Sequence, residues 1–401
     1  MKSAWILQQG VRVARIAATA NGYRIEQSDG LGAPPEFPGL LATTIPWSAL
    51  PLDYSEAAFP RFFLNMLPEG SRLSALMESS HVSNDDPLGL LLATQGEPPG
   101  DVSLESEEPR PNPSSGDAQL ENLLSSADFA WPDLNRQLLA KASIDSISGV
   151  QDKISRGSLT FRLTGSRAAK ILKIPTERFP RIAENEFFVL SLAKKCGFDV
   201  PRLELVPDVN GLKAFGIERF DRVTHHGIVR ERFHLEDGCQ LMNLSPSRKY
   251  EVRLQDLTAK MLEWASSVPQ TLEQVCALIA FSYIIGNADM HAKNISLIWR
   301  RGICDLSPAY DLLTTLPYRD HPQQMALQLY GRDNRLRLRD VLDLARNNDV
   351  RTEALAMALR KRLAPIPREI QNFGVVGFDE KTTEYVIGQV LRRYESFFAP
   401  D

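Results

Sequence analysis

The densest group of polar residues in the sequence is GNADMHAKN, residues 286–294. The group follows a long apolar stretch and precedes a strand-like segment, so we expect its side chains to project from a loop at the rim of a rigid scaffold. Asp289 and Asn294 stand five residues apart. Protein kinases use this spacing in their catalytic loop, where the aspartate orients and deprotonates the attacking hydroxyl and the asparagine holds Mg²⁺. The spacing therefore predicts phosphoryl transfer.

His291 and Lys293 lie in the same loop, and we predict that both act in catalysis with Asp289. The order of Asp289, His291 and Asn294 is similar to the D-x-H-x-x-N loop of lipid kinases and aminoglycoside phosphotransferases, whereas standard protein kinases carry HRD. The loop alone therefore leaves a small-molecule or lipid kinase open as an alternative to a protein kinase.

Asp311, at the end of LSPAYD, is the predicted carboxylate ligand of the metal, together with Asn294. It lies 17 residues after Asn294 (311 − 294), beyond a segment with the pattern of a hairpin. Magnesium prefers a few hard oxygen ligands and shares them with ATP phosphates. Either aspartate alone is equally well explained as a helix cap or a solvated loop residue, and their order and spacing together favour the metal site.

Lys173, in AAKILKIP, and Glu186, in AENEFF, fit the other half of a kinase site. There a strand lysine neutralises the α and β phosphates, and a glutamate on the next helix holds it. Viewed alone, the pair is as well explained by a solvated lysine and a first-turn glutamate attracted by the helix dipole. Its position before the catalytic loop favours the kinase role. Lys170 is the competing lysine, but side-chain alternation places it on the opposite strand face from Lys173.

The loop SISGVQDK, residues 146–153, matches neither GxGxxG nor GxxxxGKS. A loop rich in Ser and Gly can offer backbone N–H groups to phosphates. From the residues alone, a plain solvent loop explains the segment better.

The segments around these residues predict an α+β fold. Short alternating stretches up to Gln27 predict a small antiparallel sheet, and helical spacing follows over Phe59–Leu76 and Leu88–Leu92. A stretch rich in Glu, Pro and Ser near residues 105–118 predicts a linker. The predicted domains are a β-rich N-terminal subdomain (1–104), a linker (105–130), a kinase small lobe (131–223) and a mainly helical large lobe (224–401).

The small lobe is predicted from the order strand, strand, helix, hairpin, which is the layout of a kinase small lobe. The hairpin turns at Asn210-Gly211, a strong two-residue turn signal. The predicted elements are strands Leu159–Leu163 and Ala168–Ile174, helix Ala183–Lys195, and strands Arg202–Val206 and Leu212–Arg219.

Composition limits the other classes of function. A net charge of −4 and a pI near 6.0 provide no overall basic field for nucleic acid, so any DNA contact must be local or come from a partner. The four cysteines are widely spaced, which is typical of reduced, buried thiols. The first residues lack the apolar core of a signal peptide, and the uncharged run Val275–Ala288 is too short to span a bilayer. We expect a cytoplasmic protein without membrane contact.

Taken in order along the chain, the motifs resemble the HipA family, the kinase toxins of bacterial HipA–HipB modules. The resemblance covers nearly the whole chain, with the linker and the last fifty residues the least distinctive. The segments that carry it are FFLNMLPEG with LLATQGEPPGDVSL, SISGVQDK, ILKIP with AENEFF, IERFDR, HLEDGCQLMNLSPSRKYE, GNADMHAKN and LSPAYD.

This resemblance implies ATP and Mg²⁺ as cofactors and gives each motif a role. It implies a serine/threonine protein kinase with a two-lobed, HipA-like fold, in which SISGVQDK covers the phosphates and one of its serines is autophosphorylated. Ser148 departs from the usual loop and is similar to the short split toxins, so two serines compete for that role. The implied site residues are Lys173, Glu186, Ser148, Gly149 and Val150 for the nucleotide, Glu218 and Phe220 at the adenine hinge, Asp289 as the base, Asn294 and Asp311 on the metal, and Ser146 or Ser148 as the autophosphorylation site.

The implied partner is a small helix-turn-helix antitoxin, HipB, that sequesters the kinase on operator DNA, so that DNA is contacted indirectly and the complex is nucleoid-associated. The implied substrate is a translation component, an aminoacyl-tRNA synthetase, whose phosphorylation arrests growth. A catalytically inactive co-repressor that only binds HipB is a further alternative. Intact Lys173, Asp289, Asn294 and Asp311 speak against it, because an inactive kinase usually loses one such residue.

Overall fold

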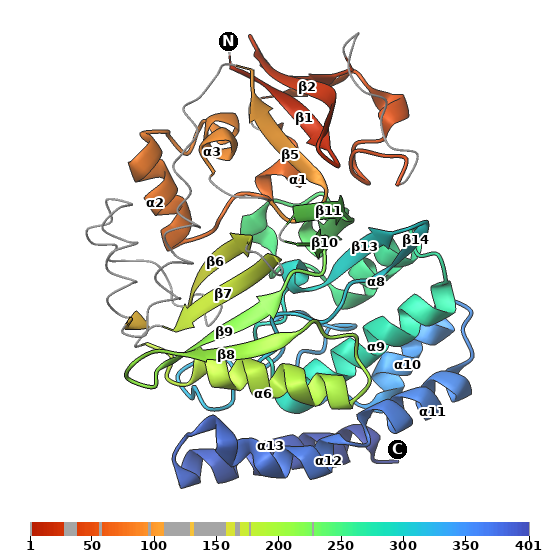
Figure 1. The fold of residues 1–401 in the computed structure, drawn as a ribbon. Coiled ribbons are helices and arrows are strands. Elements are labelled where there is room, and N and C mark those ends of the chain that lie inside the picture. Colours follow the sequence, from red (N-terminus) through yellow and green to blue (C-terminus); the bar gives the residue numbers. More distant parts are fainter. Residues whose placement is uncertain are drawn as a thin grey trace.

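The computed structural model comprises an N-terminal domain seated on a two-lobed body (Figure 1). Figure 1 shows the N-terminal sheet at one end of the molecule and the C-terminal helices α12 (Ile366–Glu369) and α13 (Glu380–Phe398) at the other. The predicted α+β arrangement is confirmed. The structure describes residues 2–27, 38–55, 58–94, 98–107, 129–131, 158–164, 169–175, 178–226 and 228–400.

The N-terminal domain is built on a five-stranded antiparallel sheet in the order β4-β3-β2-β1-β5. Ile6 and Ile16 point into its core and are fully buried, as the alternating sequence predicts. The fifth strand continues through Ser106, past the predicted start of the linker. The strands are β1 (Ser3–Gln8), β2 (Val11–Thr19), β3 (Gly22–Glu26), β4 (Leu52–Ser55) and β5 (Val102–Ser106).

The helical spacing over Phe59–Leu76 does not form one helix. The structure has α1 (Arg61–Leu64), a break, and α2 (Ser71–Ser80), followed by α3 (Pro87–Ala93). Pro68 has no N–H to donate, and Gly70 adopts a φ of 60°, so the chain turns between the two helices. The break leaves Asn65 and Glu69 on a connecting segment that faces the large lobe.

The small lobe contains a four-stranded antiparallel sheet in the order β6-β7-β9-β8. One helix, α6 (Ile182–Lys195), packs against this sheet and ends before Gly197, whose φ is 76°. The predicted hairpin turn at Asn210-Gly211 is confirmed, with Gly211 at a φ of 77°. The strands are β6 (Ser158–Thr164), β7 (Ala169–Pro175), β8 (Leu203–Pro207) and β9 (Lys213–Glu218).

The large lobe is mainly helical around α9 (Val268–Ile285), against which α8, α10, α11 and α13 pack. By length and composition α9 is apolar enough to cross a membrane, but 72% of it is buried inside the fold, as expected of a core helix. Besides α12 and α13, the α-helices described in this lobe are α7 (Gly238–Leu241), α8 (Leu254–Leu262), α10 (Leu338–Arg346) and α11 (Thr352–Leu363).

Five strands accompany these helices. The predicted hairpin after the catalytic loop is confirmed as β13 (Ser296–Arg300) and β14 (Ile303–Leu306). A third strand that the sequence did not indicate, β12 (His234–Asp237), pairs with β13 and extends the hairpin to a three-stranded sheet. A separate hairpin, β10 (Arg222–His225) and β11 (Ile228–Arg232), precedes it. Through β12, the segment HLEDGCQ lies beside the strand that leaves the catalytic loop.

The N-terminal domain docks on the body through a buried polar network. His234 of β12 lies between Asp101, 2.7 Å from Nδ1, and Glu236, 2.9 Å from Nε2, and all three side chains are almost fully buried. Glu236 also accepts hydrogen bonds from the backbone N–H and the hydroxyl of Thr43, each at 2.7 Å. Buried hydrogen bonds of this kind are directional, so the network specifies how the two domains meet, although Asp101 Oδ2 is buried without a partner among the described residues.

The charge of His234 makes this interface sensitive to pH. Burial disfavours the imidazolium, but Asp101 and Glu236 outweigh it and raise the pKa of His234 from 6.5 to about 10. Because the folded pKa exceeds the unfolded one, the stabilisation is complete below about pH 6.5 and is lost as the pH rises toward 10. We expect the Tm of the wild type to fall over this interval more than that of His234→Gln. Parallel Tm-against-pH curves for the two proteins would contradict the assignment.

Candidate active site

Three elements converge on the ammonium group of Lys173. Lys173 lies on β7, Glu186 in the second turn of α6, and Asp311 in the segment that follows β14. The Lys173 Nζ is 2.6 Å from Glu186 Oε1 and 2.6 Å from Asp311 Oδ1. The side chains of Lys173 and Glu186 are only 15% and 4% exposed. The predicted lysine–glutamate pair therefore forms, and the predicted metal carboxylate joins it.

Acidic groups outnumber basic groups in this cluster, because one ammonium lies between two carboxylates. Burial opposes the charge on Lys173, but Asp311 and Glu186 outweigh it and raise the lysine pKa above its usual value. Burial also opposes ionisation of Asp311, and Lys173 overcomes it, so that the pKa of this carboxyl is lowered. For Glu186 burial dominates and raises the pKa to about 7. The site thus keeps a charged lysine and an ionised Asp311.

The backbone at Asp311 is held in an uncommon conformation, with a φ of 54°. Non-glycine residues with a positive φ are rare and gather where the surrounding structure holds them for function. Next to it, the Tyr310 hydroxyl donates to the backbone oxygen of Lys293 at 2.7 Å and lies 2.6 Å from Ser296 Oγ. These contacts place the Asp311 segment directly against the catalytic loop.

Lys170, the competing lysine, takes no part in this cluster. Its ammonium lies 2.8 Å from Glu204 Oε1 on β8. Because positions 170 and 173 point to opposite faces of β7, the two lysines meet different carboxylates. The preference for Lys173 is consistent with this geometry.

The catalytic loop begins where α9 ends. Gly286 closes the helix with a φ of 73°, and a Cβ at this position would lie 2.6 Å from Leu316 Cγ, so only glycine fits. Asp289 and Asn294 follow and are 8% and 6% exposed. The side-chain amide of Asn294 donates to the backbone oxygen of Asp289 at 3.0 Å. That bond turns the NH₂ group into the loop and fixes the two predicted residues relative to each other.

His291 is buried in the same loop without a hydrogen-bond partner for either ring nitrogen among the described residues. Burial, reinforced by Lys249, lowers its pKa to about 3. The imidazole is therefore neutral at physiological pH, and unpaired buried ring nitrogens are costly unless a ligand or water meets them.

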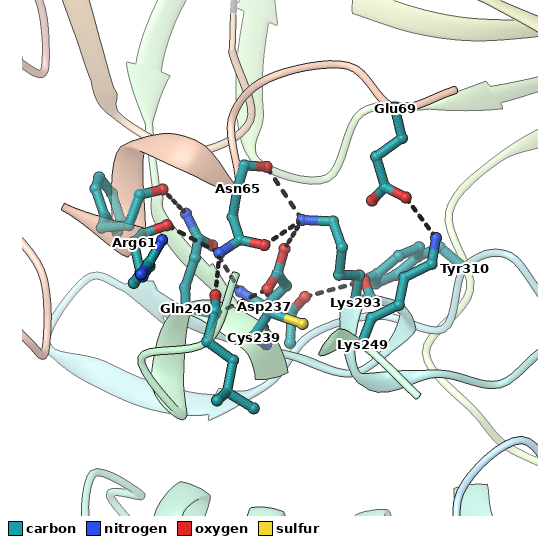
Figure 2. Close-up of polar contacts among 12 residues, drawn as sticks. Arg61, Asn65, Glu69, Asp237, Cys239, Gln240, Lys249, Lys293 and Tyr310 are labelled. Carbon is teal, nitrogen blue, oxygen red and sulfur yellow. Dashed lines mark hydrogen bonds and ion pairs between the residues drawn. The ribbon is translucent and has the colours of Figure 1, made fainter. Parts of the chain in front are cut away.

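The ammonium group of Lys293 contacts three acceptor oxygens within the protein. Its ammonium lies 2.6 Å from Asp237 Oδ2 and 3.0 and 3.1 Å from the side-chain and backbone oxygens of Asn65 (Figure 2). Asn65 belongs to the N-terminal domain, and its own amide donates to the backbone oxygen of Leu244 at 2.8 Å. Three acceptors match the three protons of an ammonium group, so this geometry favours a role for Lys293 in holding the loop.

The predicted hinge residues lie at and just after the end of β9. Glu218 ends β9, pairs with Lys170 in the sheet register, and has its carboxylate 3.9 Å from Arg202. The ring of Phe220 packs on Tyr310, with centroids 5.5 Å apart. The phosphate-loop residues Ser146, Ser148, Gly149 and Val150 lie outside the described residues.

The ligand types in this site fit Mg²⁺ brought by a nucleotide. Asp311 supplies an ionised carboxylate, and the amide of Asn294 supplies an oxygen while its nitrogen is occupied in the loop. Within the part of the chain that the structure describes, no group of three His, Cys, Asp or Glu side chains forms a dedicated metal cage. Magnesium does not require one, because it is commonly held by one or two protein oxygens together with phosphates.

Four residues of the site were not predicted: Tyr250, Tyr310, Asp237 and Asn65. Tyr250 donates to Asp289 Oδ1 at 2.9 Å. Asp237 caps α7 by accepting from the N–H groups of Cys239 and Gln240, at 2.9 and 3.0 Å. The spacing of Asp237 and Gln240, a capping box, was the available signal for the helix start. Nothing in the sequence paired Asn65 with Lys293.

Comparison with known proteins agrees with this geometry. The family model described as HipA-like C-terminal domain matches residues 145–372, and the one described as HipA N-terminal domain matches residues 5–105. A curated relative from Sinorhizobium fredii is 34% identical over 291 residues, which are 67% of this chain and 65% of that protein. The serine/threonine-protein kinase toxin HipA of Shewanella oneidensis is 26% identical over 294 residues, 67% of this chain and 66% of that protein. The matched regions thus span just under two thirds of each relative.

A solved structure resembles the whole chain. It is described as the Shewanella oneidensis MR-1 toxin–antitoxin system HipA, HipB and its operator DNA complex. The TM-score is 0.78, at 19% sequence identity, over 98% of this chain and 97% of that one. The likeness shows that the two proteins share a fold from the N-terminal sheet to the last helices.

Proposed function

This chain belongs to the HipA family of kinases, and we propose that it transfers the γ-phosphate of ATP to a serine or threonine of another protein. The observation that carries the proposal is the contact between Lys173 and Asp311 at 2.6 Å, made by residues 138 positions apart. It brings the lysine that we assign to the phosphates and the carboxylate that we assign to the metal together beside the loop that carries Asp289. A kinase needs these three groups in one place.

Each residue has a distinct task in this proposal. Lys173, charged and held by Glu186, binds the nonreacting phosphates and keeps the triphosphate aligned. Asn294 and Asp311 hold Mg²⁺, which neutralises charge on the phosphate oxygens when it is bound with ATP. Asp289 orients the hydroxyl of the substrate and accepts its proton. Glu218 and Phe220 form the edge against which the adenine lies.

We place this activity in a toxin–antitoxin module. A relative is named a serine/threonine-protein kinase toxin, and the structural neighbour was solved with HipB and operator DNA. By analogy, a small helix-turn-helix antitoxin binds this chain in the cytoplasm, and operator DNA is reached through the antitoxin. The substrate is a translation component, most simply an aminoacyl-tRNA synthetase, and its phosphorylation arrests growth.

The proposal is tested by incubating the purified chain with γ-labelled ATP, Mg²⁺ and a lysate of its host. We expect a labelled protein that yields phosphoserine or phosphothreonine on hydrolysis. Label in a lipid or a small molecule would favour the alternative suggested by D-x-H-x-x-N. A chain that binds the antitoxin but labels nothing would favour an inactive co-repressor.

Autophosphorylation of SISGVQDK follows from the same proposal. A phosphate on Ser146 or Ser148 adds about −1.5 to −2 charges at neutral pH, next to where the γ-phosphate of ATP is expected. Repulsion should move the loop away and lower the activity toward the substrate. We expect mass spectrometry after incubation with Mg-ATP to find one or both serines phosphorylated. An unmodified Ser146–Lys153 peptide, from an enzyme that still labels its target, would rule out this switch.

A further inference from the structure

A tyrosine outside the catalytic loop holds the side chain of Asp289. The Tyr250 hydroxyl donates to Asp289 Oδ1 at 2.9 Å, from the segment between β12 and α8. Its ring meets the His291 ring edge to face, with centroids 5.2 Å apart and planes at 90°. A hydrogen bond to one carboxylate oxygen restricts rotation of the carboxylate, and the ring contact restricts the donor. Tyr250 thus contacts the loop at two of its functional side chains.

The preceding residue, Lys249, supports the same loop through its backbone. The N–H of Ala292 donates to the backbone oxygen of Lys249 at 3.1 Å. Two consecutive residues therefore bind the loop at both ends of its Asp289–Ala292 stretch. A displacement of Lys249 would move Tyr250 with it, because only one peptide unit separates them.

The side chain of Lys249 reaches the N-terminal domain. Its ammonium lies 2.7 Å from Glu69 Oε2, and the two side chains are 11% and 30% exposed. Glu69 lies on the segment between α1 and α2, where the predicted single helix is broken. Figure 2 shows this pair beside the Asn65–Lys293 contact. The lysine end of this pair is largely shielded from water, whereas the glutamate end is partly exposed.

We propose that Tyr250 is a positioning residue for Asp289, and that Glu69 of the N-terminal domain keeps it in place through Lys249. This inference rests on the proposed kinase activity, in which Asp289 must direct a hydroxyl at the γ-phosphate. In-line attack requires the reacting atoms within a narrow range of distance and angle, so a carboxylate free to rotate is a poorer base. The N-terminal domain accordingly contributes to the chemical step as well as to the fold.

Tyr250→Phe is the direct test, because it removes the hydroxyl and keeps the ring against His291. We expect kcat to fall by about 10-fold to 100-fold, the loss typical of a hydrogen bond to a charged group. The KM for ATP, the affinity for Mg-ATP and the Tm should stay near wild type. Tyr330→Phe is the matched control, since Tyr330 lies at the surface of the large lobe, where its hydroxyl accepts a hydrogen bond from Asn347 at 2.7 Å.

Glu69→Gln tests the link to the N-terminal domain. We expect a smaller fall in kcat, about threefold, because the lost pair is partly exposed. Asp53→Asn is its control, as Asp53 pairs with Arg24 on the exposed face of the N-terminal sheet. If Glu69 acts through Tyr250, adding Glu69→Gln to Tyr250→Phe should cause no further loss.

These experiments test the proposed kinase activity and the positioning role of Tyr250 separately. A wild-type chain that transfers no phosphate would refute the proposed function itself. An active wild type with an unchanged kcat for Tyr250→Phe would refute the positioning role alone. If the losses in kcat of the two single variants add in the double variant, the link through Glu69 is refuted. If Tyr250→Phe lowers the Tm as well as kcat, Tyr250 acts through stability instead.

Discussion

Asp289→Asn should abolish measurable phosphoryl transfer while leaving Mg-ATP binding intact. The substitution keeps the size of the side chain and the acceptor for Tyr250, but it removes the group that accepts the proton of the attacking hydroxyl. Loss of a general base typically costs about 10²-fold to 10⁴-fold in rate. The measurement is single-turnover transfer from γ-labelled ATP.

Asp311→Asn is the companion variant, and it should lose transfer for a different reason. It removes the ionised carboxylate that we assign to the metal, which is also one of the two carboxylates that face Lys173. Mg-ATP binding should therefore weaken here, in contrast to Asp289→Asn. A rate within tenfold of wild type in either variant would overturn the assignment of that residue.

Lys173→Ala should weaken the binding of Mg-ATP by about tenfold or more, since hydrogen bonds to charged groups contribute about 1.5–3 kcal/mol each. The triphosphate is negatively charged and must be neutralised by cationic groups. Few are expected in its site, because the chain carries a net negative charge. Calorimetric titration with Mg-ATP measures this loss. Lys170→Ala is the matched control, because it lies on the same strand but pairs with Glu204.

Removing Lys173 also leaves Glu186 and Asp311 without their shared cation, and an uncompensated buried charge is destabilising. The double variant Lys173→Met, Glu186→Gln relieves that repulsion, and it should regain Tm without regaining affinity. Equal affinities of Lys173→Ala and wild type for Mg-ATP would contradict the role of this lysine.

The parts of the site that could be predicted from the sequence are those encoded locally. Strand alternation separated Lys173 from Lys170, and the Asn210-Gly211 turn marked the hairpin next to them. The spacing of Asp289 and Asn294 could be recognised because the loop is short and both residues lie within it. Such signals depend on neighbours within a few residues, so one sequence is enough to reveal them.

The unpredicted parts are contacts between distant segments. Asn65 and Lys293 are 228 positions apart, and Glu69 and Lys249 are 180 apart. An isolated lysine gives no indication of which acceptor it meets, and Lys293 was expected to act directly in catalysis. The break between α1 and α2 was also missed, because the helical spacing of Phe59–Leu76 predicts one continuous helix. The segment at this break presents Asn65 and Glu69 to the large lobe.

We propose that this chain phosphorylates a protein hydroxyl by means of Asp289. The most direct measurement compares the phosphoproteins of a host lysate incubated with Mg-ATP and either the wild type or Asp289→Asn. We expect at least one serine or threonine that is phosphorylated only with the wild-type chain. Identical phosphorylation sites with the two proteins, in a lysate where the wild type consumes ATP, would contradict it.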